Sequence, residues 1–167
     1  MLKIARNMKE LSFNSLMEIY IEGNQENGAE RWPEESRMRQ IQLAEQDFYC
    51  YLTECFFATP GAVYAVWEAD GKYVSALRLE PYRDGLLLEA LETAPEQRRK
   101  GYAAALVTAV QGWLREQGSV KIYSHVSKWN AASLRTHEKC GFQRISESAA
   151  YIDGSVNPRS CTMCYEG

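Results

Sequence analysis

The sequence predicts an α/β fold in one domain covering residues 1–167, with a mixed, mostly antiparallel twisted sheet flanked by helices. Two Asp-Gly pairs, at 70–71 and 84–85, separate three strand-like runs, and this pair is typical of two-residue hairpin turns. A strand–helix–strand unit over residues 86–126 predicts one parallel strand pair joined by a right-handed crossover. A chain of 167 residues is long enough to bury a sizeable core.

The first third of the chain is expected to be mainly helical after a short strand at residues 2–5. Apolar residues at helical spacing predict a helix over residues 8–22. Two glycines and a proline interrupt the polar segment 23–33, which is therefore predicted to be a loop. A second apolar face predicts a long helix over residues 34–57, and Pro60 stops it.

The remainder alternates strands with two helices. One helix opens near Arg98 and continues to about Gln117. A shorter helix follows Asn130 and ends at Cys140, because Gly141 suits the left-handed position after a helix. Strands are predicted at 62–67, 73–79, 86–93, 120–126, 142–152 and 159–165.

Composition narrows the classes of partner. Hydrophobic residues make up 46% of the chain and charged residues 25%, as in globular proteins. A net charge of −3 lacks the basic excess usual for nucleic-acid binding, so no nucleic-acid partner is expected. No apolar run approaches the roughly 18 residues of a membrane span, and the chain start lacks a secretory leader. We therefore expect a cytoplasmic protein with no membrane partner.

The five cysteines are irregularly spaced and do not indicate a disulfide framework. Cys161 and Cys164 form a C-x-x-C pair, but a zinc site needs a second ligand pair, and none is evident. The pair also lies in a strand-like run, whereas a thioredoxin-like pair lies at a helix start. We therefore expect buried free thiols and no metal site.

The run from Arg98 to Leu106 reads Arg-Arg-Lys-Gly-Tyr-Ala-Ala-Ala-Leu and joins a strand to a helix. Free backbone N–H groups and the helix dipole favour an anion at such a helix start. Gly101 allows a ligand to approach the backbone, and Ala103 leaves space for it. Neither a P-loop nor a Gly-x-Gly-x-x-Gly fingerprint occurs. The run predicts a phosphate or pyrophosphate site, and the alternative for its basic triplet is a solvated helix end.

Two sequence blocks carry a family resemblance. The first, Arg-x-x-Gly-x-Ala at 98–103, follows Thr-Ala-Pro at 93–95, and the second runs from Asn130 to Gly-Phe at 141–142. Together they resemble the Gln/Arg-x-x-Gly-x-Gly/Ala signature and the Asn…Gly-Phe block of the GNAT superfamily of N-acetyltransferases. Thr93 stands where the family usually has Val. The resemblance covers residues 86–142 well and the rest in outline.

The resemblance implies the GNAT acyl-CoA N-acyltransferase fold with acetyl-CoA as cosubstrate. The pantetheine arm would lie along the strand that precedes the signature, like an added strand. The pyrophosphate would lie on the backbone N–H groups from Arg99 to Ala104. The expected cofactor contacts are Leu91, Glu92, Thr93, Arg98, Arg99, Lys100, Gly101, Tyr102, Ala103, Ala104, Asn130, Ser133 and His137.

His137 departs from the usual family pattern. Most GNAT proteins carry Tyr at this position, where it donates a proton to the leaving thiolate. Relatives that resemble phosphinothricin acetyltransferases carry His within a similar Asn…His-Glu-Lys-x-Gly-Phe run. Imidazole with a pKa near 6.5 suits a proton switch, so His137 is a candidate proton donor. The alternative is a helix residue that packs beside the cofactor and transfers no proton.

The acceptor amine must lose a proton before it attacks. His125 lies on the strand before Asn130, near the place of a base-bearing Glu in ribosomal-protein acetyltransferases of this superfamily, so it is a candidate base. Glu89 and Glu92 are the other candidates. Their odd separation on a strand predicts opposite faces, so only one would face the acceptor. The alternatives are a satisfied buried histidine and two surface carboxylates.

The predicted function is transfer of an acetyl group from acetyl-CoA to a primary amine of a small molecule, by direct attack in a ternary complex. The predicted loop at 23–33 holds Glu26, Glu30 and Trp32 and is the expected acceptor wall. One alternative is a protein lysine or N-terminal acetyltransferase. Another is a non-catalytic acyl-CoA-binding module. The protein is expected to be a monomer or a homodimer.

Overall fold

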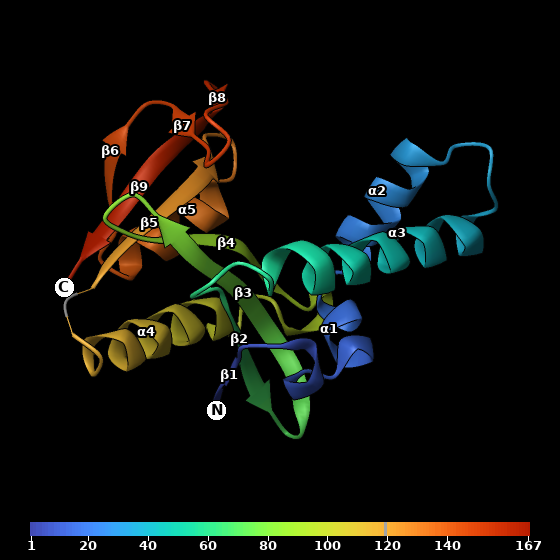
Figure 1. The fold of residues 1–167 in the computed structure, drawn as a ribbon, viewed down its shortest axis with the longest axis horizontal. Coiled ribbons are helices and arrows are strands. Elements are labelled where there is room, and N and C mark those ends of the chain that lie inside the picture. The colour runs from blue at the N-terminus through green and yellow to red at the C-terminus, as the bar shows by residue number, and fades with distance from the viewer. Residues whose placement is uncertain (119) are drawn as a thin grey trace.

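A computed structural model describes residues 1–118 and 120–167 (Figure 1). Its main sheet has seven strands in the order β1-β2-β3-β4-β5-β9-β6, and β7 pairs with β8 in a separate ribbon. No helix in this part of the chain is both long and apolar enough to span a membrane. The strands are β1 (Leu2–Ala5), β2 (Val63–Ala69), β3 (Lys72–Tyr82), β4 (Gly85–Thr93), β5 (Lys121–Ser127), β6 (Gln143–Ser146), β7 (Ala149–Ala150), β8 (Val156–Asn157) and β9 (Ser160–Glu166).

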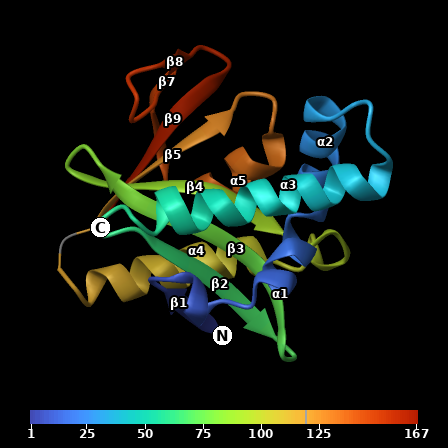
Figure 2. The same cartoon turned by 45° about the vertical axis from the view of Figure 1, so that its right-hand side comes forward.

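Helices cover both faces of the main sheet, and Figures 1 and 2 show α3 and α4 on opposite sides of its central strands. The five α-helices are α1 (Phe13–Ile19), α2 (Ile21–Arg31), α3 (Arg37–Tyr51), α4 (Tyr102–Arg115) and α5 (Ala131–Lys139). Shorter turns lie at Met8–Glu10 and Pro95–Gln97, and a π-helical turn at Leu52–Phe56 continues α3.

Successive side chains of the central strands point to opposite faces of the sheet, where they pack into two separate hydrophobic cores. Val63 and Ala65 pack under α4 with Leu106, in a cluster that also contains Phe142 after α5. Tyr64 and Val66 point to the other face and pack with Leu16, Leu52 and other side chains of α1 and the α3 extension. All neighbouring strand pairs in the main sheet are antiparallel except β4 with β5. The predicted fold class is therefore confirmed.

The two hairpin turns differ from one another. The β2–β3 turn is Asp70–Gly71, as predicted, and both residues have positive φ, as a type I′ turn requires. In the β3–β4 hairpin Tyr82 pairs with Gly85, so the turn residues are Arg83 and Asp84 rather than the predicted Asp-Gly pair. Gly85 is the first residue of β4, and a glycine is needed there because an added Cβ would lie 2.3 Å from the carbonyl oxygen of Lys121.

The prediction of a loop at residues 23–33 was wrong, because α2 covers most of that segment. The predicted helix at 8–22 is likewise divided, and Ser12 caps α1 through its hydroxyl. Gly28 is buried against α3, where an added Cβ would lie 2.6 Å from the backbone oxygen of Gln40. The Gln40 amide also donates to the Trp32 carbonyl oxygen at 3.0 Å. Tertiary packing therefore outweighs the low helix propensity of glycine here.

The predicted strand at 142–152 is also divided in the structure. Its first part is β6, which pairs with β9 and slips register between Arg144 and Ser146. The hydroxyl of Thr162 then donates to the Ser148 carbonyl oxygen at 2.8 Å, and the chain leaves the main sheet for the β7–β8 ribbon.

The two glycines of α2 provide a matched stability test. Gly28→Ala should destabilise the protein by about 1–3 kcal/mol, because its methyl group meets backbone atoms of α3. Gly23→Ala should stabilise it by up to about 1 kcal/mol, because Gly23 is exposed and nothing lies within 4 Å of an added Cβ. Urea denaturation measures both changes in the free energy of unfolding. Equal effects of the two substitutions would contradict the packing of α2 on α3.

Candidate active site

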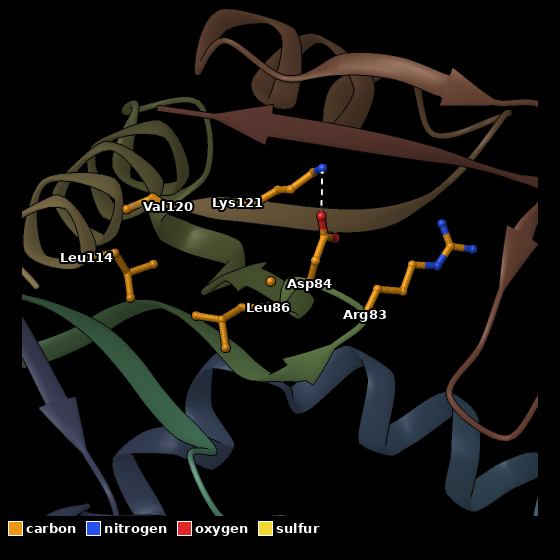
Figure 3. Close-up of a pocket in the computed structure, with 7 residues that line it drawn as sticks. Arg83, Asp84, Leu86, Leu114, Val120 and Lys121 are labelled. Carbon is orange, nitrogen blue, oxygen red and sulfur yellow. Dashed lines mark hydrogen bonds and ion pairs between the residues drawn. The ribbon is translucent and has the colours of Figure 1, made fainter. Parts of the chain in front are cut away.

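Strands β4 and β5 are hydrogen-bonded to each other at one end and separate at the other. Their parallel ladder covers only residues 86–88 of β4 and 122–124 of β5. At the joined end, Lys121 pairs with Asp84 at 2.9 Å beside a small pocket of about 260 Å³ (Figure 3). Tyr123 also donates to Asp84 at 2.5 Å. The charge of Asp84 is therefore compensated within the protein, and the opening relevant to a ligand lies at the other end of the ladder.

A β-bulge bends β4 just beyond the ladder. Two residues, Ala90 and Leu91, oppose Leu77 of β3, and Ala90 has a φ of 49°. The hydroxyl of Tyr20 donates to the Ala90 carbonyl oxygen at 2.8 Å, and the hydroxyl of Tyr64 donates to that of Tyr20 at the same distance. This chain of hydrogen bonds ties the bulge to the segment between α1 and α2.

The bulge changes which face the two candidate glutamates occupy. Glu89 pairs with Arg78, and Glu92 pairs with Ala76. Paired residues of antiparallel strands share a face, and Ala76 and Arg78 are two residues apart on β3. Glu89 and Glu92 therefore point to the same face, and the prediction of opposite faces was wrong because it assumed an uninterrupted strand.

A groove of about 660 Å³ lies between the bulged part of β4, the start of α4 and α5. The predicted cofactor residues that line it are Leu91, Glu92, Thr93, Arg98, Arg99, Gly101, Tyr102, Ala103, Ala104, Asn130 and Ser133. Lys100 and His137 were predicted to contact the cofactor but do not line this groove. The remaining lining residues, which sequence reasoning missed, are Gln97, Ala132, Arg135, Thr136 and Lys139. Those on α5 recur at helical spacing after Asn130, so a helical projection would have found them.

The start of α4 presents backbone donors to the groove. The backbone N–H groups of residues 99–104 have no hydrogen-bond acceptor among the described residues, and the first helical bond runs from Ala105 to Gly101. Gly101 has a φ of 84°, and Arg99 also lies in the left-handed region at 63°. The helix start is thus open to an anion, as helix geometry predicts.

The basic residues around the groove have different partners. Arg98 donates to Glu22 of α2 at 2.5 Å and to Glu92 at 3.3 Å. Arg99, Arg135 and Lys139 form no ion pair with any residue that the structure describes. These three side chains therefore leave positive charge at the groove, whereas Arg98 ties α2 to β4.

A hydrogen bond between two polar residues caps the start of α5. The side-chain oxygen of Asn130 accepts a hydrogen bond from the Ser133 backbone N–H at 3.0 Å, so Asn130 is the helix cap that the sequence predicted. Both residues also line the groove. The cap and the predicted contact with the cofactor are compatible.

His137 lies behind the groove wall. Its side chain packs edge-on against Phe142, and the residue is 2% exposed. Nδ1 lies 2.8 Å from the Ser133 carbonyl oxygen, which can only accept, so Nδ1 carries the proton. Burial lowers the pKa of His137, which favours the neutral ring. Nε2 is then a bare acceptor, and the neutral ring has no proton there to donate.

His125 and Glu89 come together on the face opposite α4. Glu89 lies one residue beyond the parallel ladder, beside His125 on β5. The His125 ring packs edge-on against Tyr82 and Tyr151, and burial lowers its pKa while Glu89 opposes that shift. Burial and Glu80 raise the pKa of Glu89. Within residues 1–118 and 120–167, no group of His, Cys, Asp and Glu side chains is arranged to hold a metal ion.

The lowered pKa of His137 predicts a pH dependence of stability. The unfolded chain takes up a proton near pH 6.5, whereas the folded protein resists it, so stability is lost as the pH falls below that value. The free energy of unfolding should therefore fall between pH 7.5 and 5.5 by more in the wild type than in His137→Phe. The difference should be at most about 1.4 kcal/mol per pH unit. Urea denaturation at both pH values measures it, and identical losses would show that His137 titrates normally.

Comparison with known proteins places the chain in a family. An aminoglycoside N(6')-acetyltransferase type 1 from Klebsiella aerogenes is 30% identical over 54% of this chain and 64% of its own length. The chain thus matches slightly less than two thirds of that relative. The PaiA N-acetyltransferase from Thermoplasma acidophilum, solved with coenzyme A, has a TM-score of 0.63 at 14% identity, covering 100% of this chain and 99% of its own.

The ribosomal-protein-S18-alanine N-acetyltransferase from Escherichia coli has a TM-score of 0.58 at 17% identity, over 99% and 94% of the two chains. At such identities these two likenesses show the fold alone. Residues 13–142 match the family described as Acetyltransferase (GNAT) family. Acetyl-CoA is the cosubstrate of this family, and the chain belongs to the GNAT family of acetyltransferases.

Proposed function

We propose that this single domain transfers an acetyl group from acetyl-CoA to a primary amine of a small molecule, by direct attack in a ternary complex. The observation that carries the proposal is the separation of β4 from β5. It leaves a groove lined by backbone N–H groups that are unpaired among the described residues on the α4 side, with Glu89 beside His125 on the other side of the sheet.

The lining of the groove suits two parts of the cosubstrate, its pantetheine arm and its pyrophosphate. The pantetheine arm would lie along Leu91 to Thr93, where β4 has no ladder with β5. The pyrophosphate would accept from the N–H groups of residues 99–104, at the positive end of the helix dipole. Arg99, Arg135 and Lys139 would add charge from both walls. Ala103 and Ala104 keep the space beside the helix start free of large side chains.

The residues on the opposite face could perform the proton transfer. His125, with Glu89 beside it, would take a proton from the acceptor amine, whose lone pair then forms the bond to the acetyl carbon. The carbon–sulfur bond breaks as the tetrahedral intermediate collapses, and CoA leaves as a thiolate, which is a moderately weak base. Glu92 accepts a hydrogen bond from Arg98 at 3.3 Å, whereas Arg78 lies 3.8 Å from Glu89, so the predicted role of Glu92 as base is less favoured than that of Glu89. His137 would orient α5 without giving up a proton.

The acceptor is proposed to be a small molecule because the curated relative is named for acetylation of aminoglycosides. A protein acceptor would be the second candidate, since the fold is shared with an enzyme named for a ribosomal-protein alanine. α2 would form the acceptor wall that was expected at residues 23–33, and Arg98 joins α2 to β4.

A panel of amines tests the proposal. Consumption of acetyl-CoA is followed with kanamycin, spermidine, aniline and a lysine-containing peptide. Turnover with a small amine and none with the peptide is expected. Turnover of the peptide alone would support a protein acetyltransferase. Binding of acetyl-CoA without turnover of any amine would support a non-catalytic module.

A negative charge introduced into the groove tests whether acetyl-CoA binds there. Ala103→Glu should weaken acetyl-CoA binding at least about a hundredfold, because its carboxylate would lie beside the pyrophosphate and repel it. A Glu near a helix N-terminus favours the helix, so the loss would not come from unfolding. Thr108→Glu is the control, since Thr108 is exposed on α4 outside the groove.

Isothermal titration with acetyl-CoA measures both dissociation constants. In the wild type, cosubstrate at about 100 times its dissociation constant should also raise stability by about 2.7 kcal/mol. Equal affinities of the two variants would place the cosubstrate elsewhere.

A further inference from the structure

Charged side chains from three strands converge on the sheet face opposite α4. Glu80 is two residues from Arg78 on β3, so both side chains point to that face. Glu89 pairs with Arg78 from β4, and His125 lies next to Glu89 on β5. The four residues therefore meet where β4 and β5 separate, beside the point at which the acetyl group would enter from the groove.

The single positive charge of Arg78 cannot neutralise both carboxylates, Glu80 and Glu89. The Arg78 guanidinium lies 3.8 Å from a Glu89 oxygen, and their side chains are 15% and 25% exposed. Glu80 lies near enough to Glu89 that, together with burial, it raises the pKa of the Glu89 carboxyl. When both are ionised, two negative charges face one positive charge. A cation that binds at Glu80 and Glu89 would offset the second negative charge.

Two aromatic rings lie against the guanidinium group of Arg78. Its guanidinium carbon lies 5.0 Å from the centre of the Tyr51 ring and 5.6 Å from that of Phe56. Among the described residues, Arg78 forms an ion pair with Glu89 but none with Glu80. Glu80 is therefore the carboxylate of this cluster that forms no ion pair within residues 1–118 and 120–167.

His125 provides an independent indication of a ligand at this place. Both of its ring nitrogens are buried and have no hydrogen-bond partner in the part of the chain that the structure describes. Burial of an imidazole without partners is costly unless a ligand supplies them. Arg83 also acts on His125 and, like burial, lowers its pKa, whereas Glu89 raises it. An amine N–H group is the partner that a bare imidazole nitrogen requires.

We propose that Glu80 and Glu89 together bind the acceptor as its ammonium cation, and that Glu80 restricts acceptors to aliphatic amines. Aliphatic amines are ammonium cations near neutral pH, whereas aromatic amines are neutral. The inference rests on the proposed function and names the substrate class of the same site. After binding, one ammonium N–H bond breaks, the proton passes to a ring nitrogen of His125, and the freed lone pair attacks the acetyl carbon. As the carbon–sulfur bond breaks, the second proton lost from the nitrogen passes to the leaving CoA thiolate. Glu89 then stabilises the imidazolium.

Glu80→Gln tests this assignment, because it keeps the shape of the side chain and removes its charge. It also removes a like charge beside Glu89, so the variant should fold. Glu116→Gln is the matched control, since Glu116 is exposed at the end of α4, away from the site. Steady-state kinetics are measured at saturating acetyl-CoA with aniline and with the aliphatic amine of the panel that has the highest kcat/KM.

Glu80→Gln should raise the KM for the aliphatic amine at least about tenfold, with a smaller change in kcat, because it weakens binding of the cation. The preference for that amine over aniline should fall by a similar factor. Glu116→Gln should change neither quantity. An unchanged KM in Glu80→Gln, or equal losses for both amines, would overturn the proposal.

Thermal unfolding with acetyl-CoA separates this proposal from the function on which it rests. Glu80→Gln should keep the full stabilisation by acetyl-CoA, because Glu80 does not line the cofactor groove. If the wild type binds acetyl-CoA and acetylates no amine, the proposed function fails and the ammonium site fails with it. If the wild type acetylates amines and Glu80→Gln is unaffected, only the ammonium site fails.

Discussion

The architecture of the site depends on how briefly β4 and β5 are hydrogen-bonded to each other. Three residues of β4 share a parallel ladder with β5, and then the strands separate. Gly85 and the Asp84–Lys121 ion pair hold the strands together at one end. At the other end, the bulge at Ala90 turns β4 away, and Tyr20 holds the carbonyl group of the bulge. A continuous ladder would leave no open edge on β4 for a ligand.

The opening has opposite electrostatic character on its two sides. On the α4 side, backbone N–H groups and the cations Arg99, Arg135 and Lys139 favour an anionic cosubstrate. On the other side, Glu80 and Glu89 give the proposed acceptor site an excess of negative charge. An anionic thioester and a cationic amine would therefore approach the same gap from different faces, each attracted to its own side. Such an approach is what the proposed direct attack in a ternary complex requires.

Much of this organisation follows from local sequence rules. The Asp70–Gly71 turn and the cap at Asn130 each depend on a few adjacent residues, and the structure has both where they were expected. The helix expected to open near Arg98 begins at Tyr102, after Gly101. Features set by contacts between distant segments were not predictable in this way. Gly28, for example, lies within α2 because its lack of a side chain lets α2 pack closely against α3. The turn before Gly85 lies one residue earlier than expected, and Gly85 instead lies in β4, close against Lys121 of β5.

The bulge at Ala90 had the largest consequence for predicting the site. Strict alternation along β4 separates Glu89 from Glu92, and only pairing with β3 reveals the extra residue that brings them to one face. Glu80 was not recognised because its significance comes from its neighbours on other strands. His137 was recognised from its motif, but the motif does not reveal that Nδ1 is committed to the Ser133 carbonyl oxygen.

Amide hydrogen exchange with and without acetyl-CoA tests the central claim most directly, because it reports protection of individual backbone N–H groups. The account predicts slower exchange at residues 89–93 and 99–104 when acetyl-CoA is bound, with little change at 86–88, where β4 is already paired. Protection confined to other segments, such as the pocket beside Asp84 and Lys121, would contradict it. So would an absence of protection at saturating acetyl-CoA.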